Sequence, residues 1–242
     1  VCSGTGDPMA SRVAVAPSRE APSTRDLILD AAERRFAAHG FTGVSMREIA
    51  AEAGLRNQAS LYHHFRDKRA LYEAVLARGV GPLVALVAES GEAGPAGPPS
   101  GLARGAVDAV LDRILDYLEE HPHLPRLIQR AGLDDAHQLR ATLSRLLRPL
   151  YAQGLCVLEA IGTPWTPADH PHLAAGIYHL IFGYFANATL LEVVVQEDPG
   201  SPAALARQRQ FLKVAVAELL GMAPARRLPR PAHKRSRPPE GA

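Results

Sequence analysis

The sequence has little cysteine, few aromatic residues and almost no lysine. Cys2 and Cys156 are its only cysteines and lie far apart, so the sequence predicts neither a disulfide framework nor a cysteine-based metal cluster. Such usage is typical of a reducing compartment such as the cytoplasm. Only Lys68, Lys213 and Lys234 are lysines among 27 basic residues. Arginine therefore carries most of the positive charge.

Motifs of catalysis and export are also missing. The chain contains no Gly-rich phosphate loop, no Gly-x-Ser-x-Gly turn and no His-Glu-x-x-His helix, so nothing in it supports a catalytic residue or a cofactor. Residues 13–16 form the only apolar run near the N-terminus, which is too short for the hydrophobic region of a signal peptide. These absences predict a cytoplasmic protein that is not an enzyme.

One uncharged stretch is long enough to span a bilayer. Residues 173–191 carry no formal charge over nineteen positions. His179, Asn187 and Thr189 lie within the stretch and no basic residues flank it, which is atypical of a membrane span. A helix that is apolar nearly all round is typical of a buried position or a subunit interface. We therefore expect a dimer interface here and no membrane contact.

Apolar residues at helical spacing are abundant. The chain has 242 residues and is 47% hydrophobic, which is enough for one large domain or two modest ones. Apolar residues recur every three or four positions through residues 69–90, 102–120, 135–161 and 202–220, and no alternating strand pattern occurs. The sequence therefore predicts an all-α fold.

Two short helices joined by a tight turn are predicted in residues 44–65. Ser45 is a good helix N-cap, and Glu48 can complete a capping box with it. Gly54 suits the left-handed conformation that ends a helix, and Asn57 can cap the next helix, of about two turns. This arrangement is a helix-turn-helix, whose second helix can enter the major groove of DNA.

A third helix is needed because two short helices bury too little area to be stable alone. Thr24 can serve as its N-cap and Gly40 can end it. Ile28, Ala32 and Phe36 fall four apart and give this helix one apolar face. We expect that face to pack on the helix-turn-helix pair.

Polar side chains around this unit suit contact with DNA. Glutamine can bond adenine edges, hydroxyl groups are versatile, and Tyr, His, Lys and Arg can reach phosphate oxygens. The candidate DNA-binding residues are Thr42, Ser45, Arg47, Asn57, Gln58, Ser60, Tyr62, His63, His64 and Lys68. We expect Gln58 and Ser60 near base edges. Tyr62, His64 and Lys68 are expected at phosphates. The alternative is a helical protein that never touches DNA, because paired amphipathic helices with a glycine between them are common.

The run LYHHFRDKRAL, residues 61–71, resembles the Leu-Tyr-x-His-Phe-x-x-Lys-x-x-Leu signature of the tetracycline repressor (TetR) family. The resemblance covers about residues 24–75. It implies a three-helix DNA-binding domain with a helix-turn-helix, followed by a larger helical domain that binds an effector and forms a homodimer. In this sequence the link between the turn glycine and the Leu-Tyr pair is one residue longer than usual in the family. The extra residue leaves Arg56 or Asn57 as alternatives to Gln58 for reading bases.

Four regions are expected along the chain. Residues 1–22 lack periodicity and should be a disordered tail. Residues 23–68 should form the DNA-binding domain and residues 69–221 the helical domain for ligand binding and dimerisation. Residues 222–242 should be a basic, disordered tail; they hold six basic residues against one acidic residue, so the remainder of the chain is slightly acidic despite the formal charge of +2.

The family resemblance also implies an effector pocket and a dimer interface in the second domain. Aromatic or polar-tipped residues are the pocket candidates; they are Tyr117, Tyr151, Trp165, Tyr178, His179 and Phe182. Each can equally be a plain core residue. For the interface we expect residues 173–191 and 202–220 to form a four-helix bundle with a partner, in which Gly176 and Gly183 allow close approach. The stripe assigned to residues 202–220 consists of Leu205, Leu212, Val216 and Leu219.

The expected function is that of a repressor that binds a palindromic double-stranded DNA operator as a homodimer and is released by a small-molecule effector. The alternative is a metal-binding or hydrolytic helical protein that uses His121-Pro-His123, His170-Pro-His172 and His179. Zinc ligands on one helix face stand three or four residues apart, so a spacing of two fits only a loop. We therefore predict no metal site.

Overall fold

The computed structural model describes residues 22–91, 100–133 and 136–222. Within those ranges every regular element is a helix, which confirms the predicted all-α fold. The helices are α1 (Thr24–His39), α2 (Met46–Glu52), α3 (Ala59–Tyr62), α4 (Lys68–Gly91), α5 (Ser100–Glu120), α6 (Leu124–Leu133), α7 (Ala136–Ile161), α8 (His170–Ala186), α9 (Ala188–Val195) and α10 (Pro202–Leu219). The two expected tails lie outside the described residues, apart from Pro22 and the buried Met222.

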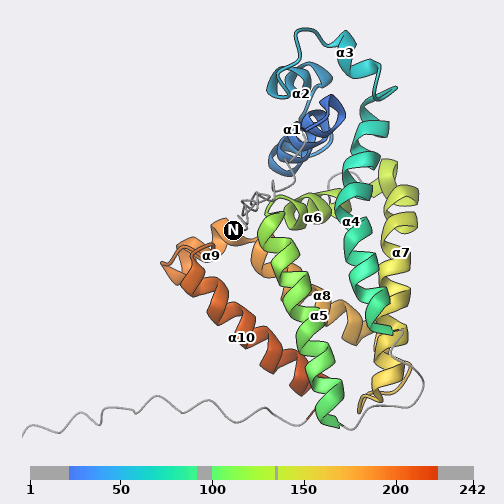
Figure 1. The fold of residues 1–242 in the computed structure, drawn as a ribbon, viewed down its shortest axis with the longest axis vertical. Coiled ribbons are helices and arrows are strands. Elements are labelled where there is room, and N and C mark those ends of the chain that lie inside the picture. Colours follow the sequence, from blue (N-terminus) through green and yellow to red (C-terminus); the bar gives the residue numbers. More distant parts are fainter. Residues whose placement is uncertain (1–21, 92–99, 134–135, 223–242) are drawn as a thin grey trace, which may run out of the picture.

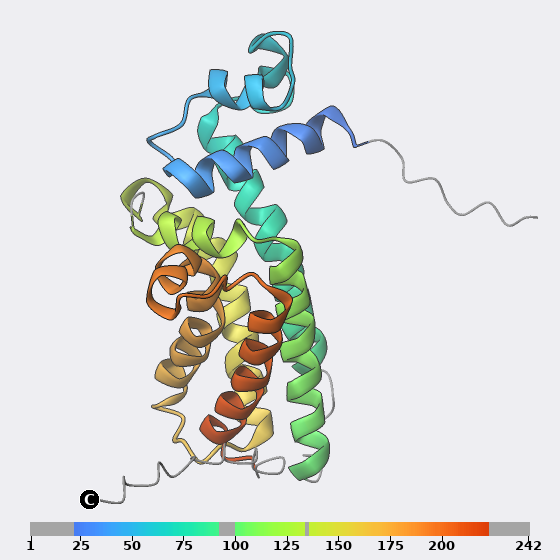
Figure 2. The same cartoon turned by 90° about the vertical axis from the view of Figure 1, so that its left-hand side faces the viewer.

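The molecule is elongated, with α1, α2 and α3 at one end (Figure 1). α4 starts at that end and runs down into the larger helical region, where it packs along α7 (Figures 1 and 2). α6 lies beneath α1 and contacts it. The expected domain boundary at residue 68 therefore falls at the first residue of a helix that both regions share.

α1 is fixed to the shared helix by buried rings. Its N-cap is Ser23, whose hydroxyl oxygen accepts a hydrogen bond from the backbone of Asp26 at 3.2 Å; the predicted cap, Thr24, is instead the first helical residue. Phe36 is fully buried, and its ring meets that of Tyr72 on α4 edge to face, with centroids 4.7 Å apart. Such a pair adds about 0.5–1.5 kcal/mol to the area that it buries.

Polar contacts on neighbouring residues of α4 join it to both regions. The Arg78 guanidinium donates to Asp30 at 2.7 Å and to the buried Glu33 at 2.8 Å, both on α1. From the other side, the Tyr117 hydroxyl of α5 donates to the Gly79 carbonyl at 3.0 Å. Arg78 and Gly79, which are neighbours on α4, thus connect this helix to α1 and to α5.

The Gly79 position leaves no room for a side chain. A Cβ added there would lie 2.3 Å from Cδ1 of Leu124, which is fully buried, whereas a Cβ at Gly81 meets nothing within 4 Å. We expect Gly79→Ala to lower the free energy of unfolding by about 1–2 kcal/mol, since overpacking outweighs the gain in helix propensity. The matched Gly81→Ala should raise it by about 0.5–1 kcal/mol. Urea unfolding measures both, and equal stabilisation by the two variants would contradict this packing.

The sequence had led us to expect one helix over the uncharged stretch at residues 173–191. The structure has two helices there instead. α8 and α9 meet at Asn187 with a bend of 77°. The side-chain amide of Asn187 donates to the Gly183 carbonyl at 2.9 Å, and its backbone N–H bonds the same oxygen at 3.1 Å. Asparagine side chains compete with the backbone in this way and so favour helix ends.

Part of the stripe expected on α10 packs within the subunit. Leu212 and Val216 are buried within the subunit, where α10 packs on α5 and α8. Phe211 is the large apolar residue that α10 leaves exposed. Periodicity thus identified an apolar stripe, of which these two residues are covered by helices of the same subunit.

By length and composition, one described helix could cross a membrane, namely α4 over Lys68–Glu89. α8 and α9 meet the same criterion only if they are taken together as one broken span. Because α4 packs against α1, α5, α6 and α7, a core helix explains its composition.

Candidate nucleic-acid interface

The first helix of the helix-turn-helix begins with the predicted capping box. The Ser45 hydroxyl oxygen accepts from the Glu48 backbone at 3.2 Å, and the Glu48 carboxylate accepts from the Ser45 backbone at 2.7 Å. The backbone hydrogen bond from Ser45, followed by the one from its hydroxyl, lowers the pKa of Glu48. The exposed Ser45 side chain is therefore engaged in starting α2, while Arg47 is exposed in the first turn.

The turn after α2 also forms as predicted. Gly54 has φ 72°, in the left-handed region. Its N–H donates to Ala51, and the Leu55 N–H reaches back to the carbonyl of Ala50 at 2.9 Å. These two bonds end the helix in the usual glycine-dependent way, and Leu55 packs on the core.

The second helix is shorter than predicted. α3 covers only Ala59–Tyr62, a single turn. The N-cap position of α3 is Gln58, one residue after the predicted Asn57, but the Asn57 carboxamide oxygen still accepts from the Ser60 backbone at 2.9 Å and from its hydroxyl at 3.1 Å. The Leu61 carbonyl then accepts from both His64 and Phe65, and the helix ends there. His63 and His64 are consequently exposed in the turn that follows and do not lie on the helix.

Two residues anchor α3, and two others form its outer pair. Leu61 and Phe65 are buried, as their spacing predicted. On the outside, the Gln58 amide donates to the hydroxyl of the exposed Tyr62 at 3.2 Å. Gln58, the candidate for reading bases, is thus held by Tyr62, a candidate for contacting phosphate, in the absence of DNA. Thr42 is exposed in the turn before α2.

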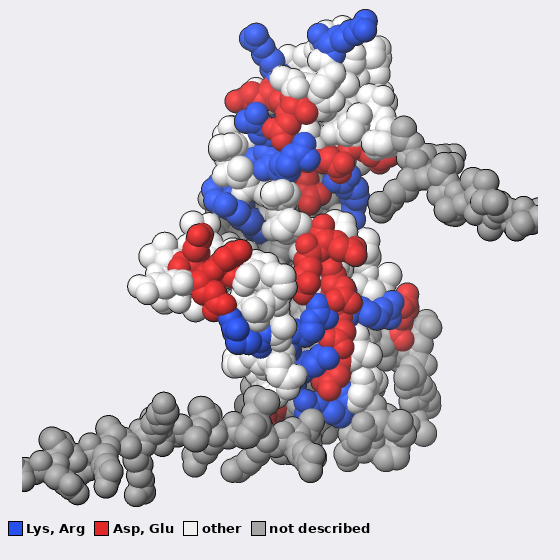
Figure 3. All heavy atoms as spheres, turned by 60° about the vertical axis from the view of Figure 1, so that its left-hand side comes forward, with Lys and Arg blue, Asp and Glu red and all other residues white. Residues whose placement is uncertain are grey.

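Two cations lie on rings of the DNA-binding candidate region, at the start of α1 and of α4. Lys68 is the first residue of α4, and its ammonium lies 4.6 Å from the centre of the Phe41 ring. The Arg25 guanidinium lies 4.7 Å from the centre of the Phe65 ring. The sequence did not identify Arg25, because only the fold brings the start of α1 beside α3. Figure 3 shows Lys and Arg side chains projecting at this end of the molecule.

Two further arginines are less suited to contact phosphates. Arg34 and Arg35 both pair with Glu52 of α2. These ion pairs hold α1 against α2 and neutralise part of the local charge. Arg66 is exposed and pairs with its neighbour Asp67 at 3.2 Å. Exposed pairs of this kind are weak, so Arg66 can turn towards a phosphate.

Three of the six effector candidates come together on α8. The Tyr178 and Phe182 rings stack with centroids 4.6 Å apart, and His179 meets Tyr178 edge to face at 5.2 Å. Burial raises the pKa of Tyr178. Phe182 is buried and His179 is exposed, so the group runs from the core to the surface.

The other three candidates lie elsewhere. Tyr117 stacks on His121 at 4.1 Å, and burial, its largest influence, raises the pKa of Tyr117 to about 12. Trp165 is exposed in the loop before α8 and donates to the carbonyl of Leu219 at 2.5 Å. Tyr151 is exposed on α7. The structure therefore does not gather all six around one space.

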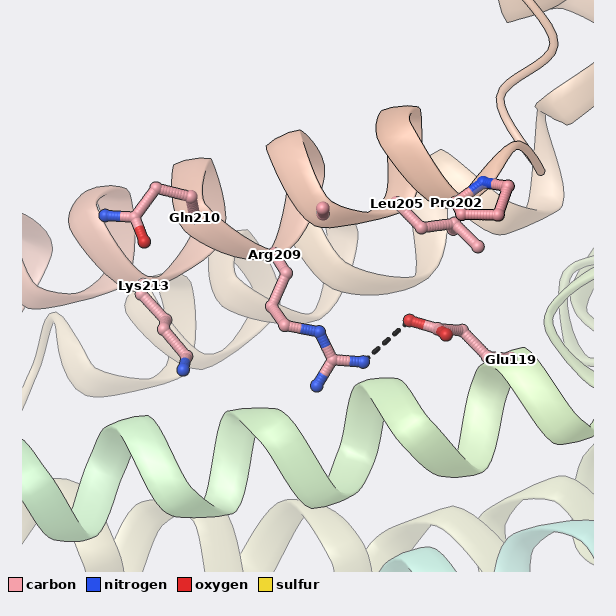
Figure 4. A pocket seen from close by; sticks show the side chains of 7 residues that line it. Glu119, Pro202, Leu205, Arg209, Gln210 and Lys213 are labelled. Carbon is pink, nitrogen blue, oxygen red and sulfur yellow. Dashed lines mark hydrogen bonds and ion pairs between the residues drawn. The ribbon is translucent and has the colours of Figure 1, made fainter.

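A hollow of about 360 Å³ lies between α5 and α10 (Figure 4). It is lined by Glu119, Pro202, Leu205, Ala206, Arg209, Gln210 and Lys213. Arg209 donates to Glu119 at 2.7 Å and to Asp116 at 2.6 Å, while Lys213 donates to Asp112 at 2.6 Å. Since both cations already bind carboxylates, the hollow is not an anion site. Its ion pairs connect α10 to α5.

A second hollow, of about 400 Å³, lies between α4 and α5. Its lining includes Pro82 and Tyr117 together with Arg113. Tyr117 is the one effector candidate among the lining residues of these two hollows. Neither of these two hollows therefore brings the predicted effector-binding residues together.

The metal-binding alternative gains no support. In the parts of the chain that the structure describes, no three His, Cys, Asp or Glu side chains lie close enough to hold a metal ion. His170 is buried with Nε2 3.1 Å from the Thr163 hydroxyl, and His121 stacks on Tyr117. Both residues therefore have structural contacts.

Known proteins resemble this chain in sequence and in fold. Residues 28–75 match the family model of bacterial regulatory proteins, tetR family. The HTH-type transcriptional repressor SCO4008 of Streptomyces coelicolor is 31% identical over 117 residues, which is 48% of this chain and 54% of that protein. The chain thus spans about half the length of that relative.

Solved structures extend the likeness over most of the chain. AmtR of Mycobacterium smegmatis is 26% identical with a TM-score of 0.57, over 87% of this chain and 100% of AmtR. The fatty acid degradation regulator FadR of Bacillus halodurans, 15% identical, shares the fold with a TM-score of 0.58 over 81% of this chain and 97% of FadR. Together with the helix-turn-helix and its signature residues, these matches show that residues 28–75 belong to the TetR family of bacterial regulatory proteins, in a chain that shares the fold of solved regulators.

Proposed function

We propose that the protein is a transcriptional repressor that binds a palindromic double-stranded DNA operator as a homodimer and is released by a small-molecule effector. The observation that carries the proposal is the helix-turn-helix itself. It presents the Gln58–Tyr62 pair at α3, with Arg25 over the ring of Phe65, which follows α3, and Lys68 at the start of α4. An amide for bases, with cations for phosphates on the neighbouring elements, is the composition of a DNA-reading surface. Such a regulator works in the cytoplasm.

Two copies are required because one turn of α3 can read too few base pairs to select a site. The open face of α8 supports a two-fold contact there. α8 carries no Asp, Glu, Lys or Arg, and Cβ atoms built at Gly176 and Gly183 meet nothing within 4 Å. Phe211 of α10 is exposed. Helices from two subunits can approach closely where glycines line the contact.

An effector would act through α4. The α8 group of Tyr178, His179 and Phe182 reaches from the core to the surface and offers a ring stack with a polar tip. Between that group and the helix-turn-helix, Tyr117 donates a hydrogen bond to Gly79 of α4, and the adjacent Arg78 donates one to α1. A shift of the larger region can therefore move α1 to α3 as a body and change the separation of the two α3 helices in a dimer.

Lys68→Ala should weaken binding to all DNA sequences alike. Lys68 is the first residue of α4, and its ammonium can reach a phosphate at this end of the molecule. Losing one phosphate contact should reduce the slope of log affinity against log salt by about one unit. Arg148→Ala is the control, because Arg148 is exposed on α7, outside the helix-turn-helix. A changed base preference with an unaltered salt slope in Lys68→Ala would contradict the phosphate assignment.

Gln58→Ala should instead relax the preference at one base pair per half-site. A bidentate contact to adenine is worth about 1–3 kcal/mol of discrimination. Affinities for a set of single-base operator variants measure the effect. If the extra residue in the turn shifts the register, Asn57→Ala or Arg56→Ala will relax a base preference and Gln58→Ala will not.

A further inference from the structure

A polar contact lies within the largely apolar packing of α4 on α7. Thr142 of α7 is 2% exposed, and its hydroxyl donates to the Glu73 carboxylate of α4 at 2.7 Å. Among the residues that the structure describes, Glu33 and His170 are the other buried polar or charged ones. A buried polar group that has its partner favours one arrangement of the structure around it. Thr142 is thus a candidate for fixing how α4 lies on α7.

The Glu73 carboxylate is held in place for this contact. It also accepts from Arg69 of the same helix at 3.0 Å, and it lies 3.5 Å from the Arg145 guanidinium of α7. The hydrogen bond from Thr142, followed by the one from Arg69, lowers the pKa of Glu73. The carboxylate is therefore ionised, which makes it a stronger acceptor than a neutral oxygen.

Glu73 stands beside the residue of α4 that holds the helix-turn-helix region. Tyr72, its neighbour in the sequence, is fully buried, and its ring meets those of Phe36 and Phe41 edge to face, with centroids 4.7 and 5.2 Å away. In Figure 1, α7 runs along α4 and begins near the end of the molecule that carries α1, α2 and α3. α7 thus contacts α4 through Glu73 at the level where α4 holds α1.

The hydrogen bond restricts α4 in a way that apolar contacts do not. Burial of apolar area is non-directional, whereas a hydrogen bond weakens steeply with distance and angle. One residue of an α-helix rises about 1.5 Å. A shift of α4 along α7 by one residue would therefore break the 2.7 Å bond between Thr142 and Glu73. Because α1 is fixed to Tyr72, such a shift would also move the whole helix-turn-helix.

We propose that Thr142 is a positioning residue, which fixes the start of α4 on α7 through Glu73 and so sets the spacing of half-sites that the dimer accepts. The inference rests on the proposed homodimeric repressor and adds a determinant of operator spacing that does not touch DNA. Neighbouring base pairs lie about 3.4 Å apart along DNA. Two helix-turn-helix units that are held rigidly can match one spacing, whereas units that are free to shift accept neighbouring spacings as well.

The test measures affinity for inverted repeats with the selected spacing and with one base pair more or fewer between the half-sites. Valine has the shape of threonine but no hydroxyl. In Thr142→Val the preference for the selected spacing should fall at least about tenfold, the factor that one hydrogen bond to a charged group represents. Glu73→Ala removes the acceptor from the other helix and should cause the same loss, so the test does not depend on one variant.

Two further variants separate the hydroxyl from other effects of substitution. Thr142→Ser keeps the donor and should retain the spacing preference of the wild type. Ser144→Ala removes an exposed hydroxyl of α7 two residues away and should leave every affinity unchanged.

The outcomes distinguish this inference from the proposed function. Equal losses of affinity at all three spacings in Thr142→Val and Glu73→Ala, or no loss at all, would mean that the contact only stabilises the fold, and the repressor would stand without it. A wild type that binds all three spacings equally would also overturn the positioning role. A wild type that binds no inverted repeat would overturn both proposals.

Discussion

Gly183→Arg is expected to give a folded, monomeric protein that no longer recognises a specific DNA site. The substitution does not disturb the subunit itself, since a Cβ at Gly183 meets nothing within 4 Å. In the proposed dimer, two arginines would face each other across a glycine-lined contact without carboxylates. Specific affinity should fall towards the non-specific level, by about 1,000-fold or more, because one subunit cannot fix the spacing of two half-sites.

Gly105→Arg is the matched control for this variant. Gly105 lies on α5, and a Cβ there also meets nothing within 4 Å. It should leave both the dimer and the DNA affinity unchanged. Sedimentation measures assembly, and a Gly183→Arg protein that remains dimeric with full operator affinity would show that the interface lies on another face.

Arg78→Ala is expected to cause the largest loss of stability among the single polar substitutions. It leaves the buried Glu33 carboxylate without its cation. Removing one partner of a buried ion pair lowers the free energy of unfolding by about 3–5 kcal/mol. Because the Arg78 side chain is itself 31% exposed, we expect about 2–3 kcal/mol in the free energy of unfolding.

Two further variants of this chain identify the cause of that loss of stability. The double variant Arg78→Ala/Glu33→Gln removes the unpaired charge and should recover about half of the lost stability. Arg113→Ala breaks a pair with Glu89 in which both side chains are about half exposed, and it should change stability by less than about 1 kcal/mol. If Arg78→Ala and Arg113→Ala were equally mild in denaturant unfolding, the pairs from Arg78 to α1 would not hold the two regions together.

Features set by near neighbours in the chain could be predicted from the sequence. The capping box of Ser45 and Glu48, the turn at Gly54 and the hydrogen bonds of Asn57 all involve residues within a few positions of one another. Each uses a side chain whose local hydrogen bond or backbone freedom is specific to that residue type. The helix-turn-helix prediction followed from these residues, whereas the family resemblance rested on the run at residues 61–71.

Features that depend on tertiary contacts could not be predicted. Leu212 and Val216 form a true apolar stripe, but periodicity does not say whether α5 or a partner covers it. The bend at Asn187 depends on one amide returning to Gly183, within a stretch whose composition favours a continuous helix. Arg25 reaches the DNA-binding surface only because α1 crosses beside Phe65.

The most direct test of the proposed function is a selection of bound sequences from random double-stranded DNA with the purified chain. A dimer of this helix-turn-helix should enrich an inverted repeat whose half-sites are separated by about one helical turn, some 34 Å, or a multiple of it. Binding to that repeat should weaken steeply with salt. Enrichment of no sequence, or of a single half-site without its inverted copy, would contradict the proposal that the protein reads a palindromic operator as a homodimer.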